Sequence, residues 1–180
     1  VMTVENVNGN VGVSYDPIKD SIYLSSIKDA NGTDSIRLTL EDTIGNRTAV
    51  AYFAINITPV NDQPDVVGIN LTYSEAQSDS AITEALANYL SVNNMGAANE
   101  SGQRLQSLSV SVLSSGHLFS IAPSIDASHN LGFSIKAFEN GLDTLQVIYQ
   151  DDAGIANSGT DRDTMTLVIT VTEVSSALSI

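Results

Sequence analysis

The chain contains no cysteine and no tryptophan, and it has few basic residues. Without cysteine, disulfide bonds and thiolate metal sites are excluded. Only 7 Lys and Arg residues stand against 21 Asp and Glu residues, which gives a formal net charge of −14 at pH 7. Nucleic acids and anionic membrane surfaces both attract clustered basic side chains, so neither is expected to be a partner.

Long apolar runs are also missing from the sequence. No stretch approaches the roughly 20 apolar residues that a membrane-spanning helix requires, and no signal peptide or lipidation motif is present. Direct membrane insertion is therefore not expected. Because the chain starts with Val1, we expect it to be a fragment of a longer protein whose targeting signals lie elsewhere.

Short alternating segments fill most of the chain. Apolar residues make up 42% of it, but aromatic residues only 6%, a composition that favours many short strands with modest cores. Period-two alternation between turn residues predicts strands over 2–7, 11–15, 22–27, 35–40, 51–57, 66–73, 105–112, 118–121, 131–135, 144–149 and 164–171. Residues 81–89 permit a short helix, although their position favours a strand with a helical tail. The predicted fold class is all-β.

A segment bracketed by two prolines divides the chain. Pro59 and Pro64 each fix their own φ and bias the preceding residue towards extended backbone, so residues 57–64 cannot continue a helix. Between the prolines, Asn61 and Asp62 place oxygen atoms on a stiffened backbone. We predict a first unit over 1–61, a second unit over 62–174, and a linker or tail over 175–180.

An internal repeat supports this division. Residues 31–42 resemble residues 140–151 at an offset of 109, and residues 55–60 resemble residues 169–174 at an offset of 114. The first unit matches only the C-terminal half of the second. It is therefore either a shorter variant or truncated at its N-terminus, and an exposed sheet edge is expected near residues 1–15.

Several short motifs share a family resemblance. In the first unit they are Tyr15-x-Pro17, the Asn-Gly-Thr-Asp-Ser of 31–35, Glu41-Asp42-x-x-Gly45 and the Thr-Pro-Val-Asn-Asp-Gln-Pro of 58–64. In the second unit they are residues 98–103, 151–154 and 170–174. The chain thereby resembles the cadherin-like tandem repeats of large bacterial surface and secreted proteins. The resemblance implies Ig-like Greek-key β-sandwiches strung end to end, calcium binding, adhesion, and extension of a binding domain encoded elsewhere.

The same resemblance implies partners and a location. The partners would be neighbouring repeats of the same polypeptide, with cell-surface molecules or polysaccharides as further ligands. The location would be extracellular or on a bacterial cell surface. The Asn-Asp-x-Pro motif of residues 61–64 has no counterpart at the end of the second unit, where Ser175 and Ser176 stand instead. A cation is therefore expected at the central segment alone.

Strand counting predicts where such a cation would bind. In a seven-stranded sandwich the loops after the second and sixth strands lie at the end where the chain enters. This brings together the predicted metal ligands Asn61, Asp62, Asn99, Glu100, Asp151 and Asp152. Clustered carboxylates repel one another, and calcium, which binds six to eight oxygen ligands, would relieve that repulsion. Zinc would require His or Cys, and only His117 and His129 exist. Solvated turns, in which Asp and Asn bond their own backbone, are the open alternative.

Catalysis is not expected, because neither histidine lies near an acidic partner in the sequence. The predicted function is that of a calcium-binding structural or adhesive repeat that extends or stiffens a large extracellular protein. The alternative is a carbohydrate-binding accessory module of a secreted polysaccharide-degrading enzyme. Six tyrosines without tryptophan offer only a thin stacking platform for sugars.

Overall fold

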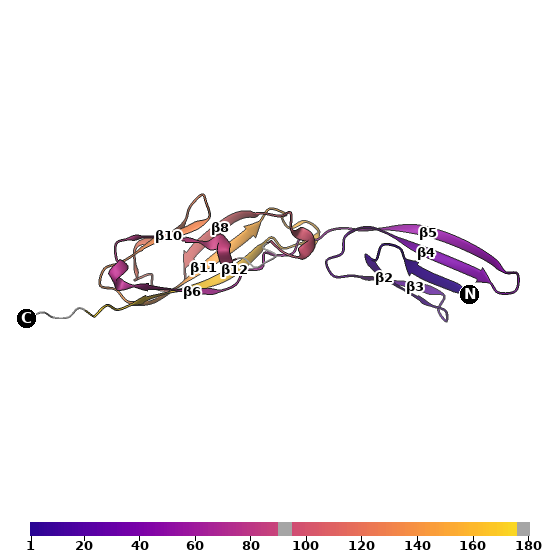
Figure 1. The fold of residues 1–180 in the computed structure, drawn as a ribbon, viewed down its shortest axis with the longest axis horizontal. Helices are drawn as coiled ribbons and strands as arrows, with labels where there is room; N and C mark the ends of the chain where they lie inside the picture. The colour runs from indigo at the N-terminus through magenta and orange to yellow at the C-terminus, as the bar shows by residue number, and fades with distance from the viewer. Residues whose placement is uncertain (90–94, 176–180) are drawn as a thin grey trace, which may run out of the picture. The chain divides into compact units, whose positions relative to one another are not determined.

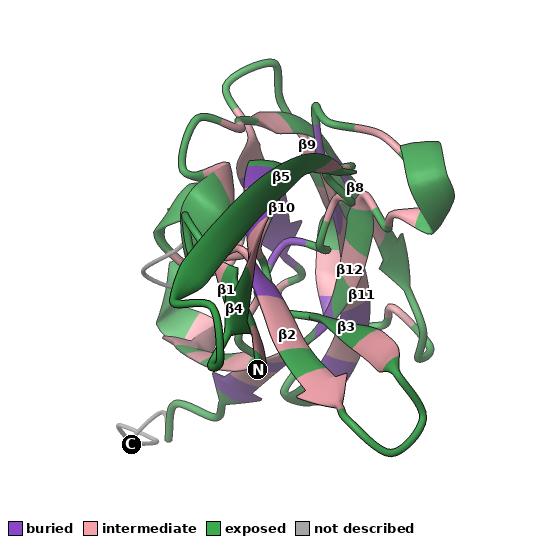
Figure 2. Ribbon diagram, turned by 90° about the vertical axis from the view of Figure 1, so that its right-hand side faces the viewer, coloured by how far each residue is buried: buried purple, intermediate pink, exposed green. Residues whose placement is uncertain are grey.

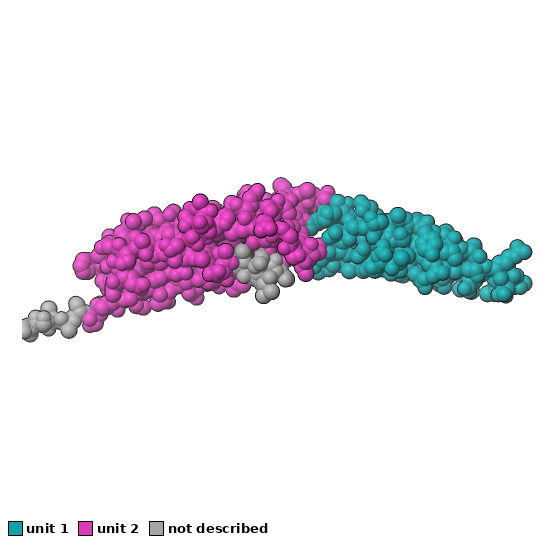
Figure 3. Space-filling model, turned by 45° about the horizontal axis from the view of Figure 1, so that its top comes forward, with its two compact units in different colours: residues 1–60 teal, residues 61–180 magenta. Residues whose placement is uncertain are grey.

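The computed structural model describes residues 1–89 and 95–175 (Figure 1). Its contacts divide the chain into two compact units, unit 1 (Val1–Val60) and unit 2 (Asn61–Ile180), coloured separately in Figure 3. The described residues of unit 1 form strands, turns and loops, and those of unit 2 also form short 3-10 helices. Among the described residues no helix is long and apolar enough to cross a membrane.

Unit 1 contains five strands in two small sheets. They are β1 (Met2–Asn6), β2 (Val11–Asp16), β3 (Ser21–Ser26), β4 (Gly32–Asp42) and β5 (Arg47–Ile57). One sheet has the order β1-β4-β5 and the other pairs β2 with β3, with all neighbours antiparallel. Buried side chains are few, with Val11 and Ile36 as the apolar ones.

The described residues of unit 2 form seven strands in two sheets. They are β6 (Ile69–Ser74), β7 (Ala81–Ala85), β8 (Leu105–Val112), β9 (Phe119–Ile125), β10 (Asn130–Ile135), β11 (Gly141–Asp151) and β12 (Arg162–Thr172). The sheet orders are β6-β12-β11-β8 and β7-β10-β9. The first strand runs parallel to the last, as the up-and-down alternation of seven strands requires. The structure confirms the predicted all-β, Ig-like β-sandwich fold class.

Short 3-10 helices interrupt the connections of unit 2. They are η1 (Glu75–Gln77), η2 (Leu86–Tyr89), η3 (Ala98–Glu100) and η4 (Ala156–Ser158). The ambiguous segment 81–89 is a strand followed by a helical turn, because β7 runs directly into η2. Residues 90–94 and 176–180, which include parts of a predicted loop and of the predicted tail, lie outside the described residues.

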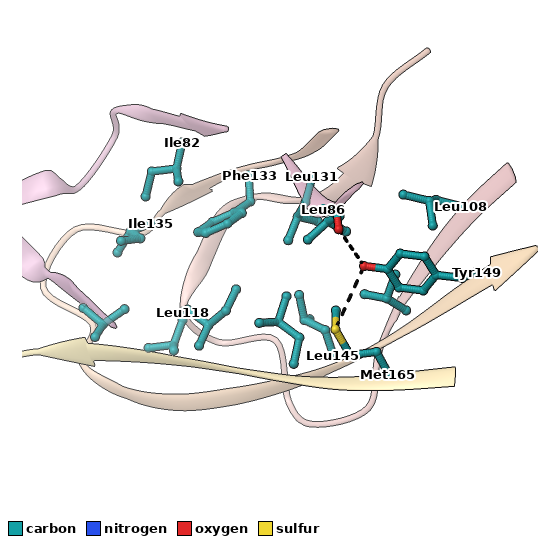
Figure 4. Close-up of a cluster of buried hydrophobic side chains, with 14 residues drawn as sticks. Ile82, Leu86, Leu108, Leu118, Leu131, Phe133, Ile135, Leu145, Tyr149 and Met165 are labelled. Carbon is teal, nitrogen blue, oxygen red and sulfur yellow. Dashed lines mark hydrogen bonds between the residues drawn. The ribbon is translucent and has the colours of Figure 1, made fainter. Parts of the chain in front are cut away.

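The core of unit 2 lies between its two sheets (Figure 4). Alternate residues of β11 and β12 are almost completely buried, among them Tyr149 and Leu167. The Tyr149 hydroxyl donates a hydrogen bond to the Leu86 carbonyl oxygen at 3.1 Å and lies 4.0 Å from Met165 Sδ. This burial raises the pKa of Tyr149 to about 12. The tyrosine thus joins β11 to η2, the helical turn that follows β7, and its buried hydroxyl is hydrogen-bonded.

The internal repeat places one buried aspartate at the same position in each unit. Asp34 on β4 and Asp143 on β11 are both fully buried. Asp34 accepts hydrogen bonds from the backbone N–H groups of Asn8, Asn10 and Val11 at 2.8–3.1 Å. The carboxylate therefore holds the β1–β2 connection against the middle of its own sheet.

Asp143 has the corresponding role in unit 2. It accepts hydrogen bonds from the backbone N–H groups of Gly116 and Leu118, each at 3.0 Å, and from the Ser114 hydroxyl. Burial alone would raise the pKa of both aspartates, but the donors around them outweigh burial and hold the pKa of Asp34 and of Asp143 below the ordinary value. Both are therefore carboxylates in the folded protein at neutral pH.

Asp143→Asn is expected to destabilise unit 2 by about 1–3 kcal/mol, because the neutral amide weakens hydrogen bonds that now end on a buried charge. Urea unfolding followed by circular dichroism would measure the loss. Asp65→Asn, at an exposed position, is the matched control and should leave the unfolding midpoint unchanged. Equal midpoints for the two variants would contradict the anchoring role of Asp143.

The lowered pKa values also predict acid sensitivity. A folded-state pKa below the unfolded value of about 3.9 contributes stability that is present above that value and is lost as the pH falls through the folded pKa. The melting temperature should therefore drop below about pH 4. Melts from pH 6 to pH 2 would show this, and Asp143→Asn should flatten the part of the drop that belongs to unit 2.

Candidate functional site at the acidic end of unit 2

Three segments of unit 2 meet where the chain enters it. They are the entry segment (residues 61–65), the loop that precedes β8 (residues 95–104), and the loop between β11 and β12 (residues 152–161). Thr160 N–H donates to the Asn61 carbonyl oxygen at 2.9 Å, and Asp152 N–H donates to the Arg104 carbonyl oxygen at 3.1 Å. Backbone hydrogen bonds thus join the entry segment to the loop between β11 and β12, and join that loop to the loop that precedes β8.

The side chain of Asn61 is the centre of this site. Its amide nitrogen Nδ2 lies 3.0 and 3.2 Å from the two carboxylate oxygens of Asp151, and 3.0 Å from the carbonyl oxygens of Gly154 and Thr160. Asp151 is fully buried, and it also accepts the Ala153 N–H at 2.9 Å. Four oxygens therefore lie around one amide N–H₂ group, which has only two hydrogens to donate. Because the amide is neutral, it does not neutralise the charge of the Asp151 carboxylate.

Gln103 completes the ring around Asn61. Its Nε2 donates to Asn61 Oδ1 at 2.8 Å. Its own oxygen, Oε1, is buried and has no hydrogen-bond partner within the part of the chain that the structure describes. A buried acceptor without a donor is unfavourable. The amide network around Asn61 is thus incomplete as it stands.

Glu100 holds the next residue of the entry segment. Its carboxylate accepts hydrogen bonds from Asp62 N–H at 3.2 and 3.3 Å and from Ala97 N–H at 3.2 Å. Gly96 makes room for this contact, because a Cβ at that position would collide with the Glu100 carboxylate and lie 3.1 Å from the Asp62 carbonyl oxygen. The loop before β8 therefore binds the backbone N–H of Asp62 and not its side chain.

The predicted ligand residues separate into two groups. Asn61 lies against Asp151, and Glu100 lies against the backbone of Asp62, as the strand count predicted for these segments. Asp152, by contrast, accepts the Arg104 N–H at 2.9 Å on an exposed turn. Asn99 is exposed, and its side chain makes no hydrogen bond to another described residue. The convergence of the loops holds, but not every predicted side chain points into it.

Other residues of the site carry no obvious sequence signal. Gln103, Gly154 and Thr160 contribute an amide and two carbonyl oxygens, which any sequence could supply. Gly159 is required for a different reason, because a Cβ there would lie 2.8 Å from Asn61 N and 2.9 Å from Asn61 Cβ. A glycine inside an otherwise polar loop was the one available sign of this close approach.

The oxygens at this end suit a hard cation better than a transition metal. Within residues 1–89 and 95–175, no group of three or more His, Cys, Asp or Glu side chains lies close enough together to hold a metal ion. A cation here would depend on carbonyl and amide oxygens beside the Asp151 carboxylate. Calcium accepts such mixed oxygen ligands. The donor types therefore fit calcium, on condition that Asn61 turns its nitrogen away.

A second polar cluster surrounds His117. His117 has no acidic neighbour in the sequence, yet its Nδ1 lies 3.5 Å from the Asp143 carboxylate and 2.8 Å from the Ser115 hydroxyl. Both partners approach the same ring nitrogen, whereas a serine triad places the hydroxyl and the carboxylate on opposite nitrogens. The cluster therefore lacks the geometry of a proton relay. It braces the turn that Asp143 anchors.

Comparison with known proteins gives the fold but no family. No protein-family model and no curated protein sequence matches the chain. A two-domain fragment of human mucin-like protocadherin (EC1-2) is similar in structure, with a TM-score of 0.51, 12% sequence identity, and coverage of 96% of this chain and 85% of that one. Its similarity supports a cadherin-like β-sandwich fold.

Two further solved structures are less similar. Chicken VE-cadherin EC1-2 has a TM-score of 0.34 at 14% identity, covering 95% of this chain and 83% of that one. A SusE-like surface polysaccharide-binding protein of Bacteroides thetaiotaomicron has a TM-score of 0.27 at 11% identity, covering 95% and 77%. At such scores neither carries an argument about this chain.

Asn61→Ala is expected to destabilise unit 2 by about 1–3 kcal/mol, since it leaves the buried Asp151 carboxylate without its side-chain donor. Denaturant unfolding in chelator would measure the effect. The control is Asn99→Ala, the same truncation on an exposed side chain of the same end, and it should change stability by less than about 0.5 kcal/mol. Equal effects would show that the Asn61 amide anchors nothing.

Proposed function

We propose that the chain is a calcium-binding structural module of an extracellular adhesive protein, of the kind that extends a bacterial surface protein. The observation that carries this proposal is the oxygen cluster around Asn61. It joins the entry segment to the loops at one end of unit 2 through a carboxylate and two carbonyl oxygens. An ion bound there would fix the course of the chain as it enters the domain.

The topology of unit 2 suits a module under tension. The chain enters at the acidic end, and β12 leaves towards the opposite end because it runs parallel to β6. A pull on the two ends would slide these strands past each other and strain all six of their paired positions, Ile69–Ser74 with Leu167–Thr172, at the same time. Hydrogen bonds that must break together resist force better than bonds that break one by one. This supports extension as the function.

Calcium would be held by residues that already lie at the site. The Asp151 carboxylate and the carbonyl oxygens of Gly154 and Thr160 would be ligands, and Asn61 would join them through Oδ1 once its amide has turned. The incomplete amide pair of Asn61 and Gln103 allows that turn, because no fully satisfied network is lost. The ion would supply positive charge to a chain with a formal net charge of −14, which relieves self-repulsion.

Thermal melts in calcium and in chelator test this proposal. A ligand at 100 times its dissociation constant adds about 2.7 kcal/mol to the stability of the folded state. We expect calcium to raise the melting temperature of unit 2, and magnesium to raise it less, because magnesium demands a tighter octahedral site. An unchanged melting temperature in calcium would contradict the proposal that the chain binds this ion.

Variants locate the ion. Asp151→Asn should abolish the calcium-dependent shift, whereas Asp65→Asn, an equal change of charge at an exposed residue of the entry segment, should retain it. A shift that survives Asp151→Asn would place the ion elsewhere. Binding to polysaccharide is a separate outcome, which an affinity gel detects: retention of the chain would favour the carbohydrate-binding alternative over a spacer.

A further inference from the structure

A hydrogen bond between two side-chain amides fixes which atom of Asn61 faces the buried carboxylate. Gln103 Nε2 donates to Asn61 Oδ1 at 2.8 Å, across 42 positions of the sequence. Because the oxygen of Asn61 is held there, its nitrogen lies against Asp151, which ends the series of alternate buried residues along β11 (Figure 2). The orientation of the Asn61 amide is thus coupled to that of Gln103.

The backbone around both amides is held in place. Gln103 N–H donates to the Glu100 carbonyl oxygen at 2.9 Å. The next residue, Arg104, donates its N–H to the Asp152 carboxylate at 2.9 Å and accepts the Asp152 N–H at 3.1 Å. The Asn61 carbonyl oxygen is itself hydrogen-bonded within the site. A change in either amide therefore requires rotation of the side chain alone.

In the observed orientation the site has more acceptors than donors. Four oxygens lie within 3.2 Å of Asn61 Nδ2, which carries two hydrogens. The buried Gln103 Oε1 has no hydrogen-bond partner among the residues that the structure describes. Buried acceptors without donors are unfavourable, and a hard cation among these oxygens would relieve the excess.

The two amides can exchange their ends only together. If the Asn61 amide turned alone, its nitrogen would face Gln103 Nε2, and two donors would meet without an acceptor. If both turned, Gln103 Oε1 would accept from Asn61 Nδ2, so the hydrogen bond would persist with its direction reversed. Asn61 Oδ1 would then face the Asp151 carboxylate. That orientation is repulsive unless a positive ion lies between the two acceptors.

We propose that Gln103 is the switching partner of Asn61, and that the two amides turn together when calcium binds beside Asp151. This inference rests on the proposed function, because it concerns the same ion site. A glutamine suits this role because its amide both donates and accepts, so it pairs with Asn61 in either orientation. The apparent affinity for calcium is set by the fraction of the protein in the ligand orientation. Gln103 therefore sets the calcium concentration at which the site fills.

Two substitutions of Gln103 should shift the calcium affinity in opposite directions. Gln103→Glu places only acceptors opposite Asn61, which favours the ligand orientation, whereas Gln103→Lys places only donors there, which favours the observed orientation. We expect the dissociation constant for calcium to fall at least about fivefold in the first variant and to rise at least about fivefold in the second, each relative to its control. Isothermal titration calorimetry on the whole chain would measure both changes.

Gln106, an exposed residue of β8, supplies the controls for charge. Gln106→Glu and Gln106→Lys make the same changes of charge in the same part of the chain, and each should alter the dissociation constant by less than about twofold, because exposed charges are screened by solvent and salt. Circular dichroism in chelator would show whether each variant is folded. If Gln103→Lys does not fold, Gln103→Glu and its control decide the question.

NMR of the side-chain amides gives a readout that does not depend on affinity. Calcium should move the N–H₂ signals of both Asn61 and Gln103, because the hydrogen bond between the two side chains reverses. The side-chain signals of Asn70, an exposed residue of β6, should stay in place.

The possible failures can be told apart. If Gln103→Glu and Gln103→Lys bind calcium as their controls do, the role of Gln103 is overturned and the calcium site remains. If bound calcium leaves the side-chain signals of Gln103 unchanged, the coupled turn is overturned. If neither the wild-type chain nor any variant binds calcium, the proposed function is overturned, and the role of Gln103 with it.

Discussion

The need to satisfy buried carboxylates governs much of this structure. Burying an ionised group without hydrogen-bond partners is strongly unfavourable, yet Asp34, Asp143 and Asp151 are all fully buried. Each carboxylate accepts hydrogen bonds from donors in another part of the chain. As a result, the positions of the loops follow from the positions of three aspartates on two equivalent hairpins.

The three carboxylates differ in the kind of donor that they accept. Asp34 and Asp143 bind backbone N–H groups of tight turns, which no side-chain rotation can withdraw. Asp151 binds the amide of Asn61, a side chain that can turn. The first two are therefore permanent anchors, while the third is an exchangeable contact. This physical difference is the reason why a cation is proposed at Asp151 and not at the other two.

Period-two alternation predicted most of the strands, and in unit 2 this alternation matches side chains that face the core between the two sheets. It underestimated β4, β5, β11 and β12, whose ends continue through polar residues, among them Asp34, Asp143 and Asp151, that remain paired across the strands. Strand counting predicted that the acidic loops converge. It did not predict that Asn99 and Asp152 are exposed and take no part in the contacts around Asn61, since side-chain contacts depend on local turns. The pairing of His117 with Asp143 links residues far apart in sequence and left no local signal.

In this chain without cysteine, the carboxylate contacts join distant parts of the sequence, as disulfide bonds do in other proteins. Asp34 ties β4 to residues 8–11, and Asp151 ties β11 to a residue 90 positions earlier in the chain. Such long closures are where a disulfide bond would stabilise a domain most. A carboxylate makes the same closure reversibly, since a proton weakens it and a cation can strengthen it. The stability of this cysteine-free chain is therefore expected to depend on the acidity of its surroundings and, through the proposed ion, on calcium, whereas a disulfide bond would depend on neither.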